Sequence, residues 1–168
     1  MSTAQHKQQA GQIACVCGVL TVSDTRTVET DGGGQRIQQL LRDAGHSIGA
    51  YAIVRDEPVQ IEHALGEWLA RTELQVIITT GGTGIARRDT TIEVVQRLIE
   101  KPLDGFGELF RMLSYQQVGS AAMLSRATAG LSGETLLFAL PGSLDAVGLA
   151  LEQLILPELP HLVWERRR

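Results

Sequence analysis

Cysteine and aromatic residues are scarce in this chain. The two cysteines, Cys15 and Cys17, lie too close together in sequence to form a disulfide without distortion. No histidine or further cysteine completes a set of metal ligands around them, and the pair is typical of small buried core residues. A chain without a disulfide framework is expected in a reducing compartment, so we expect a cytoplasmic protein.

The chain also lacks a basic charge balance and an apolar leader. Its net charge of −4 gives no indication of a nucleic-acid surface. The N-terminal segment is polar, and no apolar run approaches the length that a bilayer span requires. We therefore expect neither a nucleic-acid partner nor a membrane partner. Residues 1–12 are predicted to form a flexible tail, and residues 13–168 to form a single domain.

Apolar β-branched runs alternate with amphipathic segments along this domain. The runs predict strands at residues 13–22, 47–54, 74–80 and 134–141. Apolar residues at helical spacing predict helices at residues 33–44, 58–72, 90–100, 108–130 (with a break near Gly119) and 142–165 (interrupted by Pro157 and Pro160). The segment 101–107 is expected to be a loop. The alternation predicts an α/β protein with a three-layer α/β/α sandwich around a mostly parallel sheet.

The predicted loops at the carboxyl ends of the strands are unusually rich in glycine and polar residues. In open α/β sheets, ligands bind beyond this edge. The loops in question are residues 23–34, 55–58, 81–89 and 141–143. We therefore expect the binding site at this edge.

The most apolar predicted strand ends in the motif "TTGGTG". Glycines allow backbone N–H groups to turn toward an anion and tolerate positive φ angles, and Thr80 and Thr83 add hydroxyl groups. The motif is consistent with a phosphate cradle at the start of a helix. It is equally consistent with a tight turn packed against a neighbouring element. The glycine spacing fits neither a P-loop nor a dinucleotide-binding motif.

Asp56 and Asp89 follow two of the predicted strands. Each precedes a predicted helix, so each could serve as an N-cap, which is the commoner role for such a residue. Their position at the same edge as a glycine-rich loop suggests a second role, because two carboxylates can hold a divalent cation that bridges phosphates. Arg88 could bind anionic oxygens beside them. Ser143 could be an N-cap or a ligand hydroxyl, and Ser125 and Arg126 are further polar candidates.

An ordered set of motifs spans nearly the whole chain after the tail: "LTVSDTR", "IVRDE", "TTGGTGIARRDTT", "GFGELFR", "MLSRATAG", "LPGS" and "LILPELPHLV". Together they closely resemble the molybdenum cofactor biosynthesis protein B family, which is related to the molybdopterin adenylyltransferases. The resemblance implies an α/β/α fold, trimers or hexamers, and molybdopterin bound at the strand-end edge. In the adenylyltransferase branch, the terminal phosphate of molybdopterin attacks the α-phosphorus of Mg-ATP.

The resemblance also assigns roles to individual residues. It implies that Asp56 and Asp89 are the catalytic acidic residues and the Mg²⁺ ligands. The implied substrate-binding positions are Ser23, Asp24, Thr80, Gly81, Gly82, Thr83, Gly84, Ser125, Gly142 and Ser143, with Arg88 beside the phosphates. Molybdopterin and ATP would be the substrates, and other enzymes of cofactor biosynthesis the partners.

Two positions depart from the family pattern. Gly33 stands where a serine is usual, which removes an expected cap or phosphate-binding hydroxyl, and Ile92 replaces a proline at the start of a helix. A non-catalytic molybdopterin-binding or carrier protein of the same pathway is therefore retained as the alternative to an adenylyltransferase.

Overall fold

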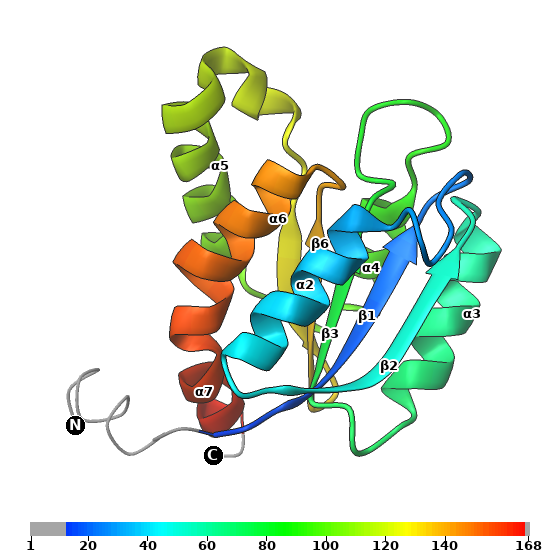
Figure 1. The fold of residues 1–168 in the computed structure, drawn as a ribbon, viewed down its shortest axis with the longest axis vertical. Helices are drawn as coiled ribbons and strands as arrows, with labels where there is room; N and C mark the ends of the chain where they lie inside the picture. Colours follow the sequence, from blue (N-terminus) through cyan, green and yellow to red (C-terminus); the bar gives the residue numbers. More distant parts are fainter. Residues whose placement is uncertain (1–12, 167–168) are drawn as a thin grey trace.

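The computed structural model describes residues 13–166 and contains one six-stranded sheet in the order β2-β1-β3-β6-β5-β4 (Figure 1). The predicted tail, residues 1–12, lies outside the described residues. The strands are β1 (Val16–Val22), β2 (Ser47–Val54), β3 (Val76–Thr80), β4 (Lys101–Pro102), β5 (Thr128–Ser132) and β6 (Thr135–Leu140). Strands β1, β2, β3 and β6 are mutually parallel, whereas β5 and β4 extend the sheet by antiparallel pairing.

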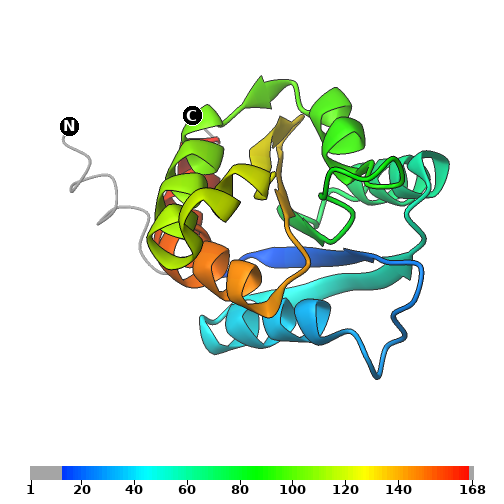
Figure 2. The same ribbon diagram turned by 90° about the horizontal axis from the view of Figure 1, so that it is seen from above.

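Helices cover both faces of this sheet, as Figure 2 shows for α2 and α3 on opposite sides of β1 and β2. The elements are α2 (Gly32–Asp43), α3 (Pro58–Leu69), α4 (Thr91–Leu98), α5 (Asp104–Val118), a 3₁₀ helix η1 (Gly119–Leu124), α6 (Leu144–Ala150), a π-helical turn η2 (Leu151–Ile155) and α7 (Leu156–Glu165). One core cluster joins α2, α5, α6 and α7 to the sheet, and a second joins α3 and α4 to its other face. The three-layer α/β/α prediction is confirmed.

The register of the parallel strands determines where the loops meet. Thr21 of β1 pairs with Ile53 of β2 and with Thr80 of β3, and Thr80 pairs in turn with Leu140 of β6. All four strands thus end within about one residue of each other. The order reverses between β1 and β3, and such a switch point in the strand order is where ligands bind in this class of fold.

The segment between α4 and β6 differs from the prediction. Residues 101–107 were expected to be a loop, but they contain β4 and the first turn of α5. The predicted helix 108–130 breaks at Gly119, as expected, with a φ of 62°, but its end is strand β5. This strand lacks a β-branched run and carries Gly130, where a Cβ would collide with the Lys101 backbone carbonyl. Close pairing with β4 therefore requires glycine, a residue of low strand propensity, at this position. For this reason the sequence pattern did not predict the strand.

The C-terminal helical segment Leu144–Glu165 is long and apolar enough to span a membrane by length and composition, with a mean hydropathy of 1.2. The expectation that no segment has such a length was wrong, and so was the expected interruption at Pro157 and Pro160, because the helix continues through both residues. Its apolar side packs into the core, where five residues at every fourth position are buried, namely Val147, Leu151, Ile155, Leu159 and Val163. Positions four apart drift by about 40° in a regular α-helix, and the wider turn of η2 reduces this drift. The π-helical turn thus keeps the stripe against the sheet.

His46 provides a pH-dependent contribution to stability. Its imidazole is 7% exposed, and Nδ1 accepts a hydrogen bond from the Cys15 backbone N–H at 3.1 Å. Burial lowers the pKa of His46, so the folded protein keeps this ring neutral. The unfolded chain binds a proton below a pKa of about 6.5. This contribution is therefore complete above that pH and decreases as the pH falls through it.

We expect the free energy of unfolding to decrease from pH 6.5 toward pH 5 with a slope of at most about 1.4 kcal/mol per pH unit from this group. His46→Asn keeps an acceptor for the Cys15 N–H and removes the titration, so the slope should become smaller. Urea unfolding at several pH values measures it. The control is His63→Asn at an exposed imidazole on α3, which should keep the wild-type slope. An unchanged slope in His46→Asn would contradict the assignment.

Candidate ligand site at the carboxyl edge of the sheet

The glycine loop after β3 packs tightly on the end of β1. Gly81 and Gly82 have φ angles of 91° and 63°, as glycine permits. A Cβ at Gly81 would collide with the Val22 carbonyl, and the Gly81 N–H donates to the Leu140 carbonyl at 3.1 Å. At this loop the ends of β1, β3 and β6 approach one another closely. Close packing alone therefore explains why residue 81 is a glycine.

Gly82 faces the buried carboxylate of Asp56. A Cβ at Gly82 would collide with Asp56 Oδ2 and with Thr91 Oγ1. The Thr91 hydroxyl is buried without a hydrogen-bond partner among residues 13–166, and the Thr91 N–H donates to the Gly82 carbonyl at 3.0 Å. Thr91 was not singled out from the sequence. Its only sequence signal was its position at the start of a helix after the glycine loop.

Asp56 is 8% exposed and does not cap the helix that follows it. Its Oδ1 accepts hydrogen bonds from the Thr90 N–H at 3.3 Å and the Thr90 hydroxyl at 3.2 Å. No hydrogen bond to Oδ2 occurs within the described part of the chain. Burial raises the pKa of Asp56, and the negative charges of Asp89 and Asp24 add to this effect, whereas the Thr90 hydrogen bonds oppose it.

Asp89 lies within the glycine loop and does not cap α4, because Thr90 occupies the N-cap position. Its Oδ2 accepts a hydrogen bond from the Ala86 N–H at 2.9 Å, and a Cβ at Gly84 would collide with this carboxylate. Asp56 binds Thr90, the residue next to Asp89. Both carboxylates thus border the glycine loop, Asp56 at Gly82 and Asp89 at Gly84.

The two carboxylates could contribute to a magnesium site, although they do not form a complete one. Within residues 13–166, no group of three or more His, Cys, Asp or Glu side chains is arranged to hold a metal ion. Mg²⁺ commonly binds one or two carboxylates and completes its shell with water and substrate phosphates. Neither Asp56 nor Asp89 caps the helix that follows it, and burial raises the pKa of Asp56. Both features fit carboxylates that share a Mg²⁺ ion with substrate phosphates.

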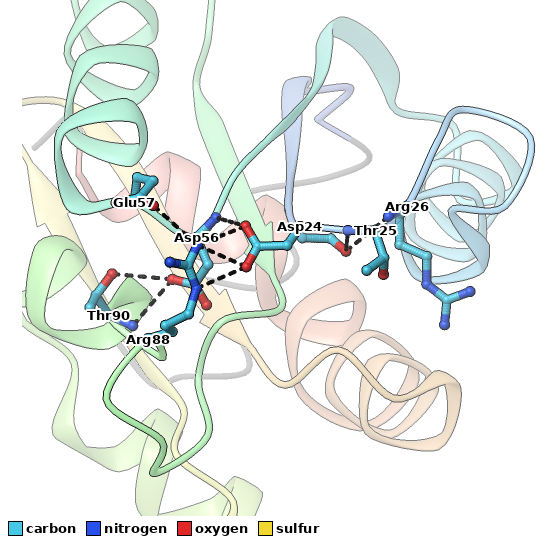
Figure 3. A network of polar contacts seen from close by, with 8 residues as sticks. Asp24, Thr25, Arg26, Asp56, Glu57, Arg88 and Thr90 are labelled. Carbon is cyan, nitrogen blue, oxygen red and sulfur yellow. Dashed lines mark hydrogen bonds and ion pairs between the residues drawn. The ribbon is translucent and has the colours of Figure 1, made fainter.

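Arg88 does not point freely toward a ligand. Its guanidinium donates from Nε and Nη2 to Asp24 at 3.0 Å and from Nη2 to Glu57 at 3.1 Å. Figure 3 shows it lying between these two carboxylates, in front of Asp56. Asp24 also accepts a hydrogen bond from the Asp56 N–H at 3.2 Å. Arg88 therefore joins three strand-end loops, and phosphate binding would have to compete with Asp24 and Glu57.

The chain segment before β5 reaches the same loop through Arg126. This residue donates from Nε to the Thr83 carbonyl at 2.9 Å and from Nη2 to the Asp89 carbonyl at 3.3 Å. It also binds Glu93 of α4, and this ion pair lowers the pKa of Glu93. Ser125 and Arg126 line a hollow of about 410 Å³ between α4, α5 and β5. Ser125 thus lies on the wall of a cavity beside the loop.

A family model described as "Probable molybdopterin binding domain" matches residues 18–161. The chain belongs to this family. Molybdenum cofactor biosynthesis protein B of Bacillus anthracis is 48% identical over 169 residues, which cover 100% of this chain and 99% of the relative. The protein of the same name from Staphylococcus carnosus is 56% identical over 152 residues, or 89% of each chain.

Solved structures of the family share the fold. The crystal structure of a molybdenum cofactor biosynthesis protein B matches with a TM-score of 0.91 and 47% identity, over 94% of this chain and 99% of the other. The tungsten cofactor synthesizing protein MoaB from Pyrococcus furiosus matches with a TM-score of 0.82 and 39% identity, over 92% and 98%. The chain is thus a molybdenum cofactor biosynthesis protein with a molybdopterin-binding domain.

Within this molybdopterin-binding domain, several predicted site residues have structural partners. The Ser23 hydroxyl accepts hydrogen bonds from the Thr25 and Arg26 N–H groups, which shapes the loop after β1. Thr80 donates to the Pro141 carbonyl at 3.1 Å. Ser143 is the N-cap of α6 and accepts a hydrogen bond from the Ala146 N–H, so the capping alternative is confirmed.

Gly33 differs from the family pattern without loss of the helix cap. Asp31 is the N-cap of α2 and accepts a hydrogen bond from the Gly34 N–H at 2.9 Å. A Cβ at Gly33 would make ordinary contacts with the Gly142 carbonyl at 3.5 Å and with Thr80 Oγ1 at 3.7 Å. Gly33 thus faces the strand-end edge, and the space beside it would accommodate a serine side chain.

Gly82→Ala should destabilise the protein by about 1–3 kcal/mol, because alanine disfavours the positive φ and its Cβ collides with Asp56 and Thr91. The matched control is Gly66→Ala in the exposed middle of α3, where no atom lies within 4 Å of the added Cβ. That variant should gain about 0.5–1 kcal/mol from helix propensity. Chemical denaturation measures both changes. Equal effects of the two substitutions would refute the packing argument.

Proposed function

We propose that the protein transfers the adenylyl group of Mg-ATP to the terminal phosphate of molybdopterin. The single observation that carries this proposal is that Asp56 and Asp89 border the same glycine loop of a molybdopterin-binding domain, since Gly82 faces Asp56 Oδ2 and Gly84 faces Asp89 Oδ2. Neither carboxylate caps the helix that follows it. The ordinary structural explanation for each residue is therefore weakened, which favours a role in ligand chemistry.

The electrostatics of the pair require a cation when phosphates bind. Two carboxylates beside a triphosphate would repel it, and the pKa of Asp56 is already raised, chiefly by burial and further by the negative charges of Asp89 and Asp24. Asp56 and Asp89 would hold Mg²⁺, which would neutralise charge on the phosphates. The oxygen of Asp56 without a hydrogen bond, Oδ2, faces the glycine loop and suits this role.

The reaction makes few other demands on side chains. A phosphate oxygen of molybdopterin would form a bond to the α-phosphorus of ATP, and the bond from that phosphorus to pyrophosphate would break. A phosphate monoester is already a competent nucleophile at neutral pH, so no activated serine or cysteine is required. Positioning and charge stabilisation dominate such transfers. This agrees with a site made of backbone, two carboxylates and nearby hydroxyls.

Asp56→Asn and Asp89→Asn should each reduce formation of adenylated molybdopterin by at least about 10²-fold, because an amide cannot supply the charge that holds the cation. Binding of molybdopterin alone should change by less than about threefold. Product analysis by mass spectrometry and a titration with molybdopterin measure the two effects. Glu134→Gln, in the exposed turn before β6 at the opposite edge, is the control. Wild-type protein that binds molybdopterin but forms no product would end the proposal.

A carrier function is the second candidate, and the position of Arg88 favours it. Its guanidinium is already bound by Asp24 and Glu57, so its charge is paired within the protein. A carrier would need to bind molybdopterin but would not need the two carboxylates. Equal rescue of a deficient strain by the wild-type gene and by the Asp56→Asn, Asp89→Asn double variant would favour the carrier.

We further propose that the protein assembles into trimers or hexamers through an apolar stripe on α5. Leu109, Met112, Tyr115 and Val118 occur at every third position and are 47–64% exposed. Successive members of this set are offset by about 60° around the helix, so the stripe winds around the exposed side of α5 instead of following one face. This many exposed apolar side chains on one helix are typical of an interface.

Light scattering after size exclusion should give a mass of three or six chains. The Met112→Glu, Tyr115→Glu double variant should give a smaller assembly with an unchanged circular dichroism spectrum, because it places charge on the stripe. Val59→Glu, at an exposed apolar residue on α3, should leave the assembly intact. A wild-type monomer at micromolar concentration would contradict the assignment.

A further inference from the structure

Arg126, in the segment before β5, donates hydrogen bonds to the backbone of the glycine loop after β3. Residues 83–89 form an excursion between β3 and α4, and the carbonyls at the two ends of this excursion, of Thr83 and Asp89, both accept hydrogen bonds from the same guanidinium. A single planar group with several donors can satisfy two carbonyls and a carboxylate together, which an ammonium group cannot do with the same geometry. The excursion carries Asp89, one of the two carboxylates of the candidate site.

The guanidinium is itself fixed by α4. Its Nη1 lies 2.5 Å from Glu93 Oε1, and its Nη2 lies 3.3 Å from Glu93 Oε2. The Arg126 side chain is 28% exposed, so the ion pair is only partly screened by water. Glu93 lies in the first turn of α4, and that helix begins directly after Asp89 and Thr90. The loop, the helix and the segment before β5 are thus joined at one side chain.

We propose that Arg126 is a positioning residue, which sets the place of Asp89 opposite Asp56 by binding both ends of the excursion. It contacts neither carboxylate of the pair. Its effect on turnover rests on the proposed adenylyl transfer, whereas its effect on the order of the loop does not. Arg126 also lines the hollow beside Ser125, so a ligand in that hollow would contact the side chain that holds the loop.

The order of the loop is tested by hydrogen exchange of the backbone amides of residues 81–90 in the ligand-free protein. Arg126→Ala and Arg126→Lys should both exchange at least about tenfold faster in this segment, because neither can bind both carbonyls. Arg71→Ala is the matched control, since Arg71 also binds one carboxylate, of Glu73, and one carbonyl, of Gly49. It should leave exchange at residues 81–90 unchanged. Wild-type exchange in Arg126→Ala would overturn the proposal.

Exchanging the charges of Glu93 and Arg126 distinguishes the effect of their ion pair from the effect of the hydrogen bonds to the two carbonyls. In the Glu93→Arg, Arg126→Glu double variant, the opposite charges are restored, but a glutamate at position 126 has no N–H to donate to the carbonyls. We expect a melting temperature closer to wild type than that of Arg126→Glu alone, with exchange at residues 81–90 still fast. Recovery of wild-type exchange in the double variant would show that the ion pair alone matters and would overturn the proposal.

Turnover supplies the third measurement. A displacement of about 1 Å at a catalytic group can cost about 10²-fold in rate. With molybdopterin and Mg-ATP, Arg126→Lys should lower kcat by about tenfold or more while KM for ATP changes less than about threefold. A rise in KM with unchanged kcat would overturn the positioning role. If the wild-type protein forms no product, adenylyl transfer fails as a function, and the exchange measurements still decide the role of Arg126.

Discussion

Parallel pairing of β1, β2, β3 and β6 is the constraint on which the site depends. Because the four strands run in the same direction and are nearly in register, their following loops all start at one edge. Backbone polar groups buried there without partners would cost stability, and the loops supply partners to one another. The Ser23 N–H donates to the Val54 carbonyl, and the Gly81 N–H donates to the Leu140 carbonyl. Residues far apart in sequence are thereby held together.

Glycine at this edge has two distinct physical causes. At Gly81 the backbone of β1 approaches so closely that no side chain fits, and this would hold for any function. At Gly82 the space that a side chain would occupy borders Asp56 Oδ2 and the unpartnered hydroxyl of Thr91. The second case is more informative, because a buried hydroxyl without a partner costs stability. Thr91 Oγ1 and Asp56 Oδ2 are thus polar atoms at this position whose arrangement close packing of the glycine does not explain.

The periodicity of the sequence was sufficient to predict the parallel half of the fold. Buried β-branched runs and helical spacing predicted β2 with the correct bounds, and Gly119 correctly marked a break. The antiparallel half was not predictable in this way, because β5 is short and its Gly130 is required by the contact with β4. For the site, strand-end position predicted that Asp56 and Asp89 lie at the same edge of the sheet, and Asp56 binds Thr90, the residue next to Asp89. It could not predict that Asp24 and Glu57 bind Arg88, since side-chain pairing across loops leaves no local pattern.

The two arginines around the glycine loop show why sequence position alone assigns roles poorly. Arg88 lies within the predicted phosphate motif, yet its side chain turns outward to Asp24 and Glu57. Arg126 lies far along the chain, yet it binds the carbonyls at both ends of the excursion that carries Asp89. An arginine bound by two carboxylates has little charge left to attract a phosphate, whereas an arginine bound to carbonyls fixes backbone geometry. The backbone of the loop that carries Asp89 is therefore bound by a distant arginine, whereas the arginine inside the motif binds neighbouring loops.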